Sequence, residues 1–149
     1  MKRMTFLVAI AVIAAAPLSA QGISGTWFTE FERQMRNQDG VVSGGDKIKA
    51  KITLAQKGDS LIGTWEIVPA SGQPTPPARP LRGAFRDGKG TLVSEFDARR
   101  NINGEESVAK VTVIYDFTVS GDKLEGTSKT RSSDMEMPSP PFSAWREKQ

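Results

Sequence analysis

The stretch ITLAQKGDSLIGTWEIV, residues Ile52 to Val68, contains two runs of alternating apolar and polar residues joined by Gly58-Asp59. Successive side chains of a strand point to opposite faces, so the alternation predicts two half-buried strands around a tight turn. The pattern recurs later in the chain, where GDSLIGT at Gly58–Thr64 is answered by GDKLEGT at Gly121–Thr127. Repeated hairpins that each expose an apolar face must close on one another to bury it, which predicts a small antiparallel barrel.

The first twenty residues do not follow this pattern. Lys2 and Arg3 precede an apolar run, Phe6 to Ala16, and small residues lead to a cleavage position after about Ala20. These features are typical of a secretory signal peptide, which leaves residues 21–149 as a single domain. The apolar run is shorter than the roughly 20 residues of a membrane-spanning helix, although a retained N-terminal anchor is the alternative. We expect no membrane span after signal cleavage, and a mature protein in the periplasm or outside the cell.

Composition argues against several functional classes. The chain has no His and no Cys, so it lacks a His-based triad, a thiol nucleophile and an ordinary zinc site. Two neighbouring carboxylate pairs, Glu30 with Glu32 and Glu105 with Glu106, are expected to be solvated. We therefore expect no enzyme, no catalytic residues, no metal and no cofactor. Loss of Lys2 and Arg3 with the signal leaves 18 basic against 17 acidic residues, a balance that does not indicate nucleic-acid binding.

Strand and turn signals predict eight strands of an up-and-down barrel. Tight turns follow the second, fourth and sixth strands, whereas the connections after the other strands are long and polar or rich in proline. Alternate connections of such a barrel lie at the same end, so we expect a closed base and a mouth ringed by four loops. The predicted strands are 22–32, 46–57, 60–68, 81–86, 91–98, 107–119, 123–131 and 142–148, and the long connections are 34–45, 69–80, 99–106 and 132–141.

Short motifs link this pattern to a known group of barrels. The opening GISGTWF, Gly22–Phe28, resembles the first strand of lipocalin-type and avidin-type barrels, in which a Gly-x-Trp strand begins the fold and closes its base. Gly63-Thr64-Trp65 and the closing FSAWR, Phe142–Arg146, are similar to the same wider calycin group. The resemblance implies an eight-stranded barrel that binds a small molecule in its cup, the part of the interior that opens at the mouth.

The biotin-binding pattern of avidins is not matched. Thr29 and Arg33 stand where that pattern has a polar amide and a hydroxyl, and Trp65 and Ile67 stand where it has an aromatic hydroxyl followed by a serine. The resemblance therefore implies a barrel with a different ligand.

Strand alternation places aromatic and hydroxyl side chains inside the barrel, the mixture that small-molecule pockets use. Gly126, Ser128 and Thr130 are small where a filled core would have Leu or Val. Eight strands enclose an interior that side chains just fill or that holds one small ligand. We expect the ligand-binding residues to be Trp27, Thr29, Phe31, Arg33, Trp65, Phe85, Tyr115, Ser128 and Thr130.

The expected ligand is a small hydrophobic or amphipathic molecule, with Arg33 as a polar anchor for an acid-bearing one. In the alternative interpretation the tryptophans fill the interior. The solid barrel would then be a scaffold whose loops 69–80 and 132–141 contact a protein partner, as in an inhibitor or an envelope-assembly module.

Overall fold

The computed structural model describes residues 22–36, 42–132, 135–136 and 139–147, and it describes the side chains of these except at 33–36, 42–44, 100, 102, 135 and 136. The predicted signal peptide lies outside the described residues. The strands are β1 (Gly25–Arg36), β2 (Val42–Lys57), β3 (Ser60–Val68), β4 (Arg79–Arg86), β5 (Lys89–Ile102), β6 (Glu105–Ser120), β7 (Lys123–Ser132), β8 (Met135–Glu136) and β9 (Pro141–Arg146).

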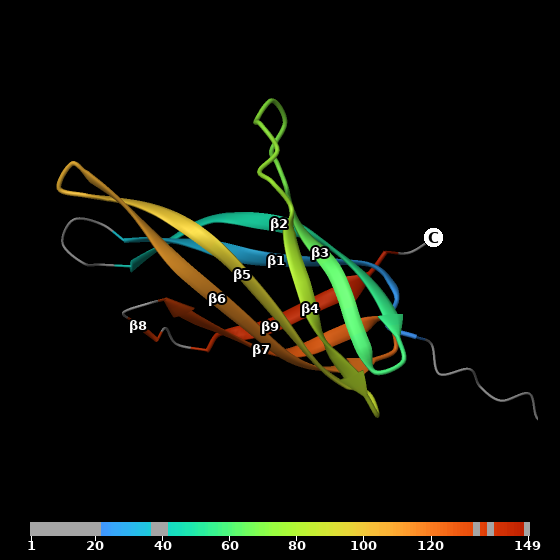
Figure 1. Ribbon diagram of the computed structural model, residues 1–149. Helices are drawn as coiled ribbons and strands as arrows, with labels where there is room; N and C mark the ends of the chain where they lie inside the picture. The colour runs from blue at the N-terminus through green and yellow to red at the C-terminus, as the bar shows by residue number, and fades with distance from the viewer. Residues whose placement is uncertain (1–21, 37–41, 133–134, 137–138, 148–149) are drawn as a thin grey trace, which may run out of the picture.

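Eight of these strands close into an antiparallel barrel (Figure 1). Strands β1 to β7 pair in sequence order, and β9 pairs with both β7 and β1 to complete the circle. Closure removes the sheet edges that repeated hairpins would otherwise expose. The two-residue strand β8 is an addition to this circle, since it pairs only with the end of β7. The predicted all-β, eight-stranded up-and-down barrel is confirmed.

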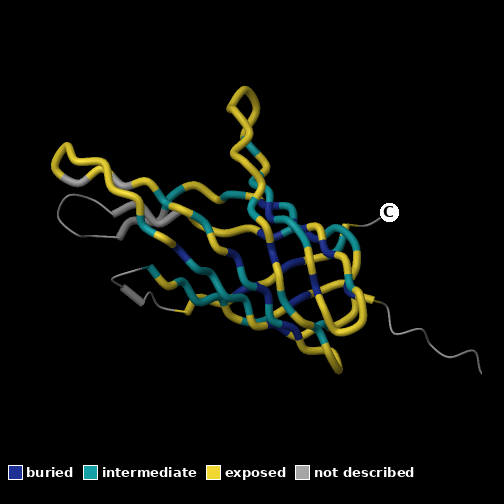
Figure 2. The backbone as a smooth tube through the Cα atoms, in the orientation of Figure 1, coloured by how far each residue is buried: buried dark blue, intermediate teal, exposed yellow. Residues whose placement is uncertain are grey.

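Tight turns close one end of the barrel, which we call the base. Gly58, Gly88 and Gly121 adopt positive φ angles of 61°, 78° and 60° at the three turns, a conformation that glycine reaches without steric cost. The apolar side chains that point inward near the base are almost fully buried (Figure 2), among them Ile52, Leu61, Leu81, Leu92 and Leu124, each 1% exposed or less.

The segment before β1 seals the base. Ile23 is completely buried, and its carbonyl accepts a hydrogen bond of 2.9 Å from Nε1 of Trp27. The guanidinium of Arg146 lies 4.3 Å from the centre of the Trp27 ring and donates hydrogen bonds to the carbonyls of Ser24 (2.8 Å) and Gly22 (3.0 Å). The last strand thus ties the first segment of the described chain across the barrel floor.

Three inward glycines allow strands to approach closely near the base. A Cβ on Gly126 would lie 1.8 Å from the carbonyl oxygen of Asp116, and one on Gly83 would lie 1.8 Å from that of Thr91. A Cβ on Gly63 would lie 2.0 Å from the carbonyl oxygen of Thr53. Gly126 is therefore small because the backbone of β6 stands where its Cβ would be, and it lines the hollow at the base. Such glycines permit the sharp coiling that closes a barrel.

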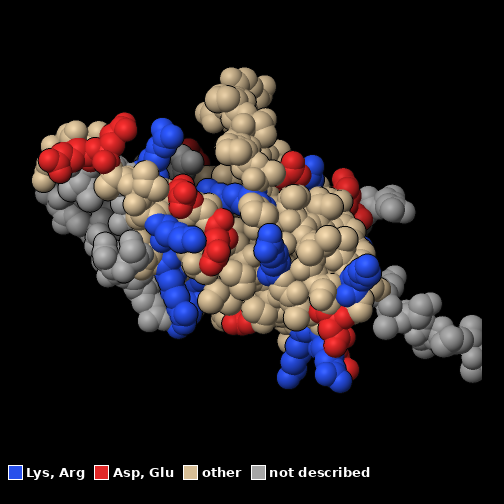
Figure 3. All heavy atoms as spheres, viewed as in Figure 1, with Lys and Arg blue, Asp and Glu red and all other residues tan. Residues whose placement is uncertain are grey.

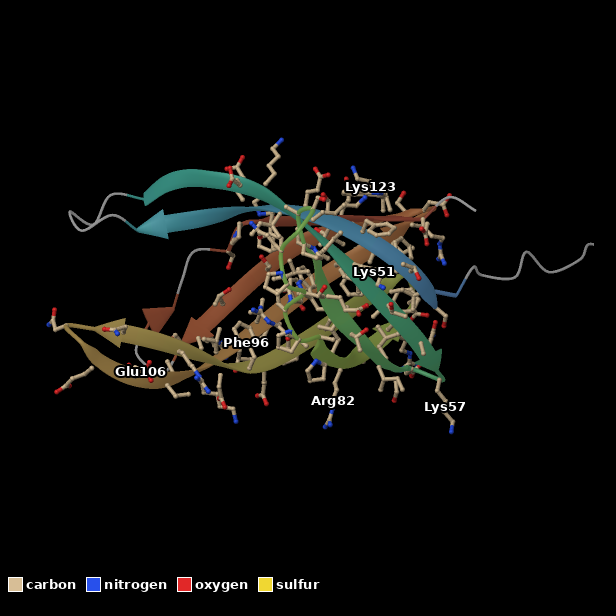
Figure 4. All side chains as sticks on the ribbon, turned by 90° about the horizontal axis from the view of Figure 1, so that it is seen from above. Lys51, Lys57, Arg82, Phe96, Glu106 and Lys123 are labelled. Carbon is tan, nitrogen blue, oxygen red and sulfur yellow. The ribbon has the colours of Figure 1, made fainter. Side chains whose placement is uncertain are left out.

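The mouth differs from the four-loop rim that the sequence predicts. Residues 99–106 are not a loop, because β5 and β6 continue and are joined by Asn103-Gly104. Both residues have positive φ, 55° and 85°, as in the tight turns that extend a hairpin without splaying its strands. The resulting ribbon projects beyond the barrel at the same end as the extended ends of β1 and β2 (Figures 1 and 4).

Three other predicted connections are shorter than expected. Strand β1 runs to Arg36 and β2 starts at Val42, so residues 34–36 and 42–44 of the predicted loop 34–45 are paired with each other. Arg79 and Pro80, the end of the predicted loop 69–80, pair with Trp65 and Thr64 in β3. The predicted loop 132–141 includes β8. Polar and proline-rich composition predicted loops where the chain forms strands. Strands that extend beyond the barrel are solvated, so they do not need an apolar face.

Candidate ligand-binding site in the barrel

The inner surface of the barrel changes character between the base and the mouth. Most inward side chains near the base are fully buried, with Phe85 and Val119 as partly buried exceptions. Ile67, Val113, Ser128 and Thr130 near the mouth also point inward and are partly exposed, although Val111 beside them is buried. Inside a closed barrel, solvent reaches such residues only through the mouth. Solvent therefore reaches part of the inner face near the mouth, and we call this upper part of the interior the cup.

Aromatic side chains from four strands meet at the cup. The rings of Trp65 and Tyr115 are stacked, with centroids 5.2 Å apart and an interplanar angle of 17°. Phe31 lies 6.0 Å from Trp65, and Phe142 lies 5.0 Å from Tyr115, both at tilted angles. Offset or tilted pairs at these distances are favourable ring arrangements. The four rings form one apolar wall that joins β1, β3, β6 and β9.

Arg79 brings a cation to the same region. It pairs with Trp65 in the β3–β4 register, which places both side chains on the inner face. Its guanidinium carbon lies 3.7 Å from the centre of the Phe96 ring, a cation–π contact. Burial is the main reason that the pKa of Arg79 is lowered, and the nearby Tyr115 acts in the opposite direction.

Two largely buried hydroxyl groups, of Tyr115 and Ser94, also belong to the cup. Burial raises the pKa of Tyr115 well above its ordinary value of 10.0, and the positive charge of Arg79 offsets only part of that effect. The phenol is therefore a neutral hydrogen-bond donor at physiological pH. Ser94, 2% exposed on the inner face of β5, has a buried Oγ with no hydrogen-bond partner. An unsatisfied buried hydroxyl costs roughly 1–3 kcal/mol.

The predicted site residues fall into two groups. Phe31, Trp65, Tyr115, Ser128 and Thr130 all lie in or beside the cup, where the register places Ser128 opposite Tyr115 and Thr130 opposite Val113. Their assignment to a ligand stays a prediction.

The other predicted residues have different surroundings. Trp27 is buried in the base, and Thr29 donates a 2.7 Å hydrogen bond to the carbonyl of Ser143. Phe85 stacks on Phe117 at the base, with centroids 6.5 Å apart. Arg33 lies at an irregularity in the β1–β2 pairing, and its side chain is outside the described set. The alternation that predicts its direction is interrupted at this point.

Three contributors to the cup are absent from the predicted set. Arg79 was assigned to a loop because prolines surround it, yet it lies two residues before Leu81 and four before Gly83, so it belongs to their inward series. The same alternation on β5 places Ser94 between the inward residues Leu92 and Phe96. Phe142 begins the inward series of β9. Period-2 counting from the buried end of each strand would have found all three.

A second hollow lies outside the cup, at the base beside the β4–β5 turn. It has a volume of about 540 Å³, and Phe85, Gly90 and Phe117 contribute its apolar lining. Two of its polar groups are paired: Thr91 donates a 2.7 Å hydrogen bond to Asp116, and Glu125 forms an ion pair with Lys123. The cations Arg86 and Lys89 also belong to its lining, and Arg86 lies 3.8 Å from Asp87.

Charge is dispersed over the face of the molecule shown in Figure 3, where basic and acidic side chains alternate across the barrel. The projecting 69–78 connection carries no charged residue. In the part of the chain that the structure describes, no group of three or more His, Cys, Asp or Glu side chains is placed to hold a metal ion. The same part contains no helix long and apolar enough to cross a membrane.

The chain matches no protein-family model, no curated protein and no solved structure. The fold defines its class as a closed eight-stranded antiparallel β-barrel, with aromatic rings in contact inside it. This architecture is consistent with the calycin-like resemblance of the sequence, and nothing assigns the chain to lipocalins or to avidins in particular.

Proposed function

We propose that this protein is exported and binds a small, partly apolar molecule in the cup, in the periplasm or outside the cell. One observation carries the proposal: on the inner face near the mouth, Ile67, Val113, Ser128 and Thr130 are partly exposed, close to a group of four aromatic rings in contact. A barrel filled for stability alone would be packed along its whole length, as protein interiors are. The basic start and apolar run of residues 2–16 support the export step.

The aromatic wall supports a ligand with an apolar body. Trp65 is 7% exposed and Phe31 is 37% exposed, so the wall presents a graded apolar surface from the cup floor to its rim. Pockets of this kind combine aromatic walls with a few polar groups that orient the ligand. Arg79, Tyr115 and Ser94 are such groups.

Tryptophan substitutions test the cup directly. Trp65→Ala removes the centre of the aromatic wall, and we expect it to weaken binding of the neutral fluorescent probe 1-aminoanthracene at least tenfold. The matched control is Trp145→Ala, because Trp145 lies on the outer surface, 38% exposed and paired with Phe28. Equal probe affinity in the wild type and Trp65→Ala would refute the cup. Native mass spectrometry of the protein from its own compartment would show the natural ligand as an extra mass that is lost on unfolding.

A protein partner at the 69–78 connection is a second candidate. Residues 70–78 are all exposed, and the connection stands away from the barrel (Figures 1 and 2). Its prolines keep it extended, which lowers the entropy lost when a partner binds. Replacing residues 70–77 with a short Gly-Ser linker should leave 1-aminoanthracene binding unchanged. It should abolish binding only to a protein partner.

A further inference from the structure

The cup contains a cation, Arg79, that has no counter-charge among the described side chains. The described part of the chain has its ion pairs on the outer surface or at the base, at Lys51–Glu66, Arg86–Asp87, Lys123–Glu125 and Arg146–Asp122. Among these described residues no carboxylate lies within 4.0 Å of the Arg79 guanidinium. A partly buried guanidinium loses hydration and normally regains the lost interaction from an anion. Arg79 has only the face of Phe96.

Donors other than Arg79 face the same space. Tyr115 is stacked on Trp65, the register neighbour of Arg79, and its phenol is close enough for the charges of the two groups to interact. On β5, Ser94 lies one inward position deeper than Phe96. The polar side of the cup therefore offers a positive charge and neutral hydroxyls, with no carboxylate among the described inward residues. This combination favours an oxyanion over a cation or a neutral amide.

We infer that the cup selects an amphipathic carboxylate, whose carboxylate group binds Arg79 and Tyr115 while its apolar body lies on the wall formed by Phe31, Trp65 and Phe142. The inference rests on the proposed function of the cup. A single described cation favours a singly charged head over a phosphate dianion, which would leave one negative charge uncompensated. The guanidinium can donate two parallel hydrogen bonds to one carboxylate even while its face stays on Phe96.

Two ligands that differ only in their head group, and substitutions at two arginines of the same strand, test the selectivity for acids separately from ligand binding itself. The ligands are dodecanoate and dodecanol, which share an alkyl chain and differ in the charge of the head, and binding is measured by displacement of 1-aminoanthracene. The variants are Arg79→Gln, Arg79→Lys and Arg82→Gln. Arg82 is the control because it belongs to the same strand but is exposed and points away from the barrel (Figure 4).

Dodecanoate should bind the wild type about tenfold or more tightly than dodecanol, since a desolvated charge-assisted pair is among the stronger polar interactions. Arg79→Gln should remove that preference without weakening dodecanol binding, and Arg82→Gln should keep it. Arg79→Lys should retain a reduced preference, because lysine keeps the charge and loses the planar fork. Circular dichroism and urea unfolding confirm that each variant is folded.

Two outcomes overturn the inference, and they differ in what else they refute. If dodecanoate and dodecanol bind equally well and Arg79→Gln changes neither affinity, the cup is real and its selectivity for acids is wrong. If neither ligand displaces 1-aminoanthracene and Trp65→Ala leaves the probe signal unchanged, the proposed function fails together with the inference.

Discussion

Tyr115 makes the state of the cup measurable by one titration, because it is the single tyrosine of the chain. Burial raises its pKa above the ordinary 10.0, so the tyrosinate absorption of the folded protein should appear only well above that pH. Unfolding in urea should return the titration midpoint to about 10. The near-ultraviolet absorption difference between the two titrations reports this residue alone, since the three tryptophans do not ionise.

The same shift makes folding stability depend on pH, with a sign that follows from proton binding. Between pH 10 and the raised pKa of the folded state, the unfolded chain releases the Tyr115 proton while the folded chain keeps it. The stabilisation is therefore complete below pH 10 and is lost as the pH rises. The loss amounts to about 1 kcal/mol between about pH 10 and 11, because half of the unfolded phenol is already ionised at pH 10 and nearly all of it at pH 11.

Tyr115→Phe isolates this contribution, because it removes the ionising group and keeps the ring that stacks on Trp65. The free energy of unfolding in urea, measured for both proteins at about pH 10 and about pH 11, should fall by about 1 kcal/mol more in the wild type than in the variant. Lysine and arginine titrations are common to both and cancel in the difference. A folded-state midpoint near 10, or equal pH dependence of the two proteins, would show that Tyr115 is freely hydrated and that the cup is wider than the structure shows.

Two substitutions at the base test how the barrel is closed. Arg146→Met removes the hydrogen bonds to Ser24 and Gly22, and it should lower the free energy of unfolding in urea by about 2–4 kcal/mol. The control is Arg86→Met, at a 77% exposed side chain, which should lower it by less than about 0.5 kcal/mol. Similar losses in both variants would contradict the proposed seal of the base. Gly126→Ala should destabilise by about 3 kcal/mol or more because its Cβ meets the Asp116 carbonyl, and Gly22→Ala, whose Cβ has no neighbour nearer than 3.8 Å, is the control whose effect should stay within about 0.5 kcal/mol.

The barrel could be predicted from the sequence because its determinants are local. Alternating residues give the strands, and Gly58, Gly88 and Gly121 give the tight turns, so consecutive antiparallel pairing follows with little freedom. The pairing of β9 with β1 and β7, which closes the barrel, could not be predicted from alternation alone, since β9 has only six residues. It was predicted because unclosed hairpins would leave apolar faces in water.

The site was less predictable because it depends on exceptions to the local rules. Proline-rich composition concealed that Arg79 belongs to a strand, and an irregularity at Arg33 interrupted the alternation that assigned its direction inward. Turn chemistry at Asn103-Gly104 was taken as a loop signal, although two positive φ angles continue the hairpin. Trp27 and Phe85 were correctly expected to face inward, but pattern alone does not distinguish the depth of an inward residue along the barrel.

The two halves of the barrel differ in how fully their inward side chains are packed and paired. Apolar side chains at the base are buried almost completely, and Arg146 ties the chain across the floor. The upper half instead holds a cation without a described carboxylate and a serine Oγ without a hydrogen bond, both of which cost stability. A fold tolerates such costs where the rest of the structure offsets them, and they concentrate at functional sites. The packed base can therefore offset the stability that the unpaired polar groups in the cup cost.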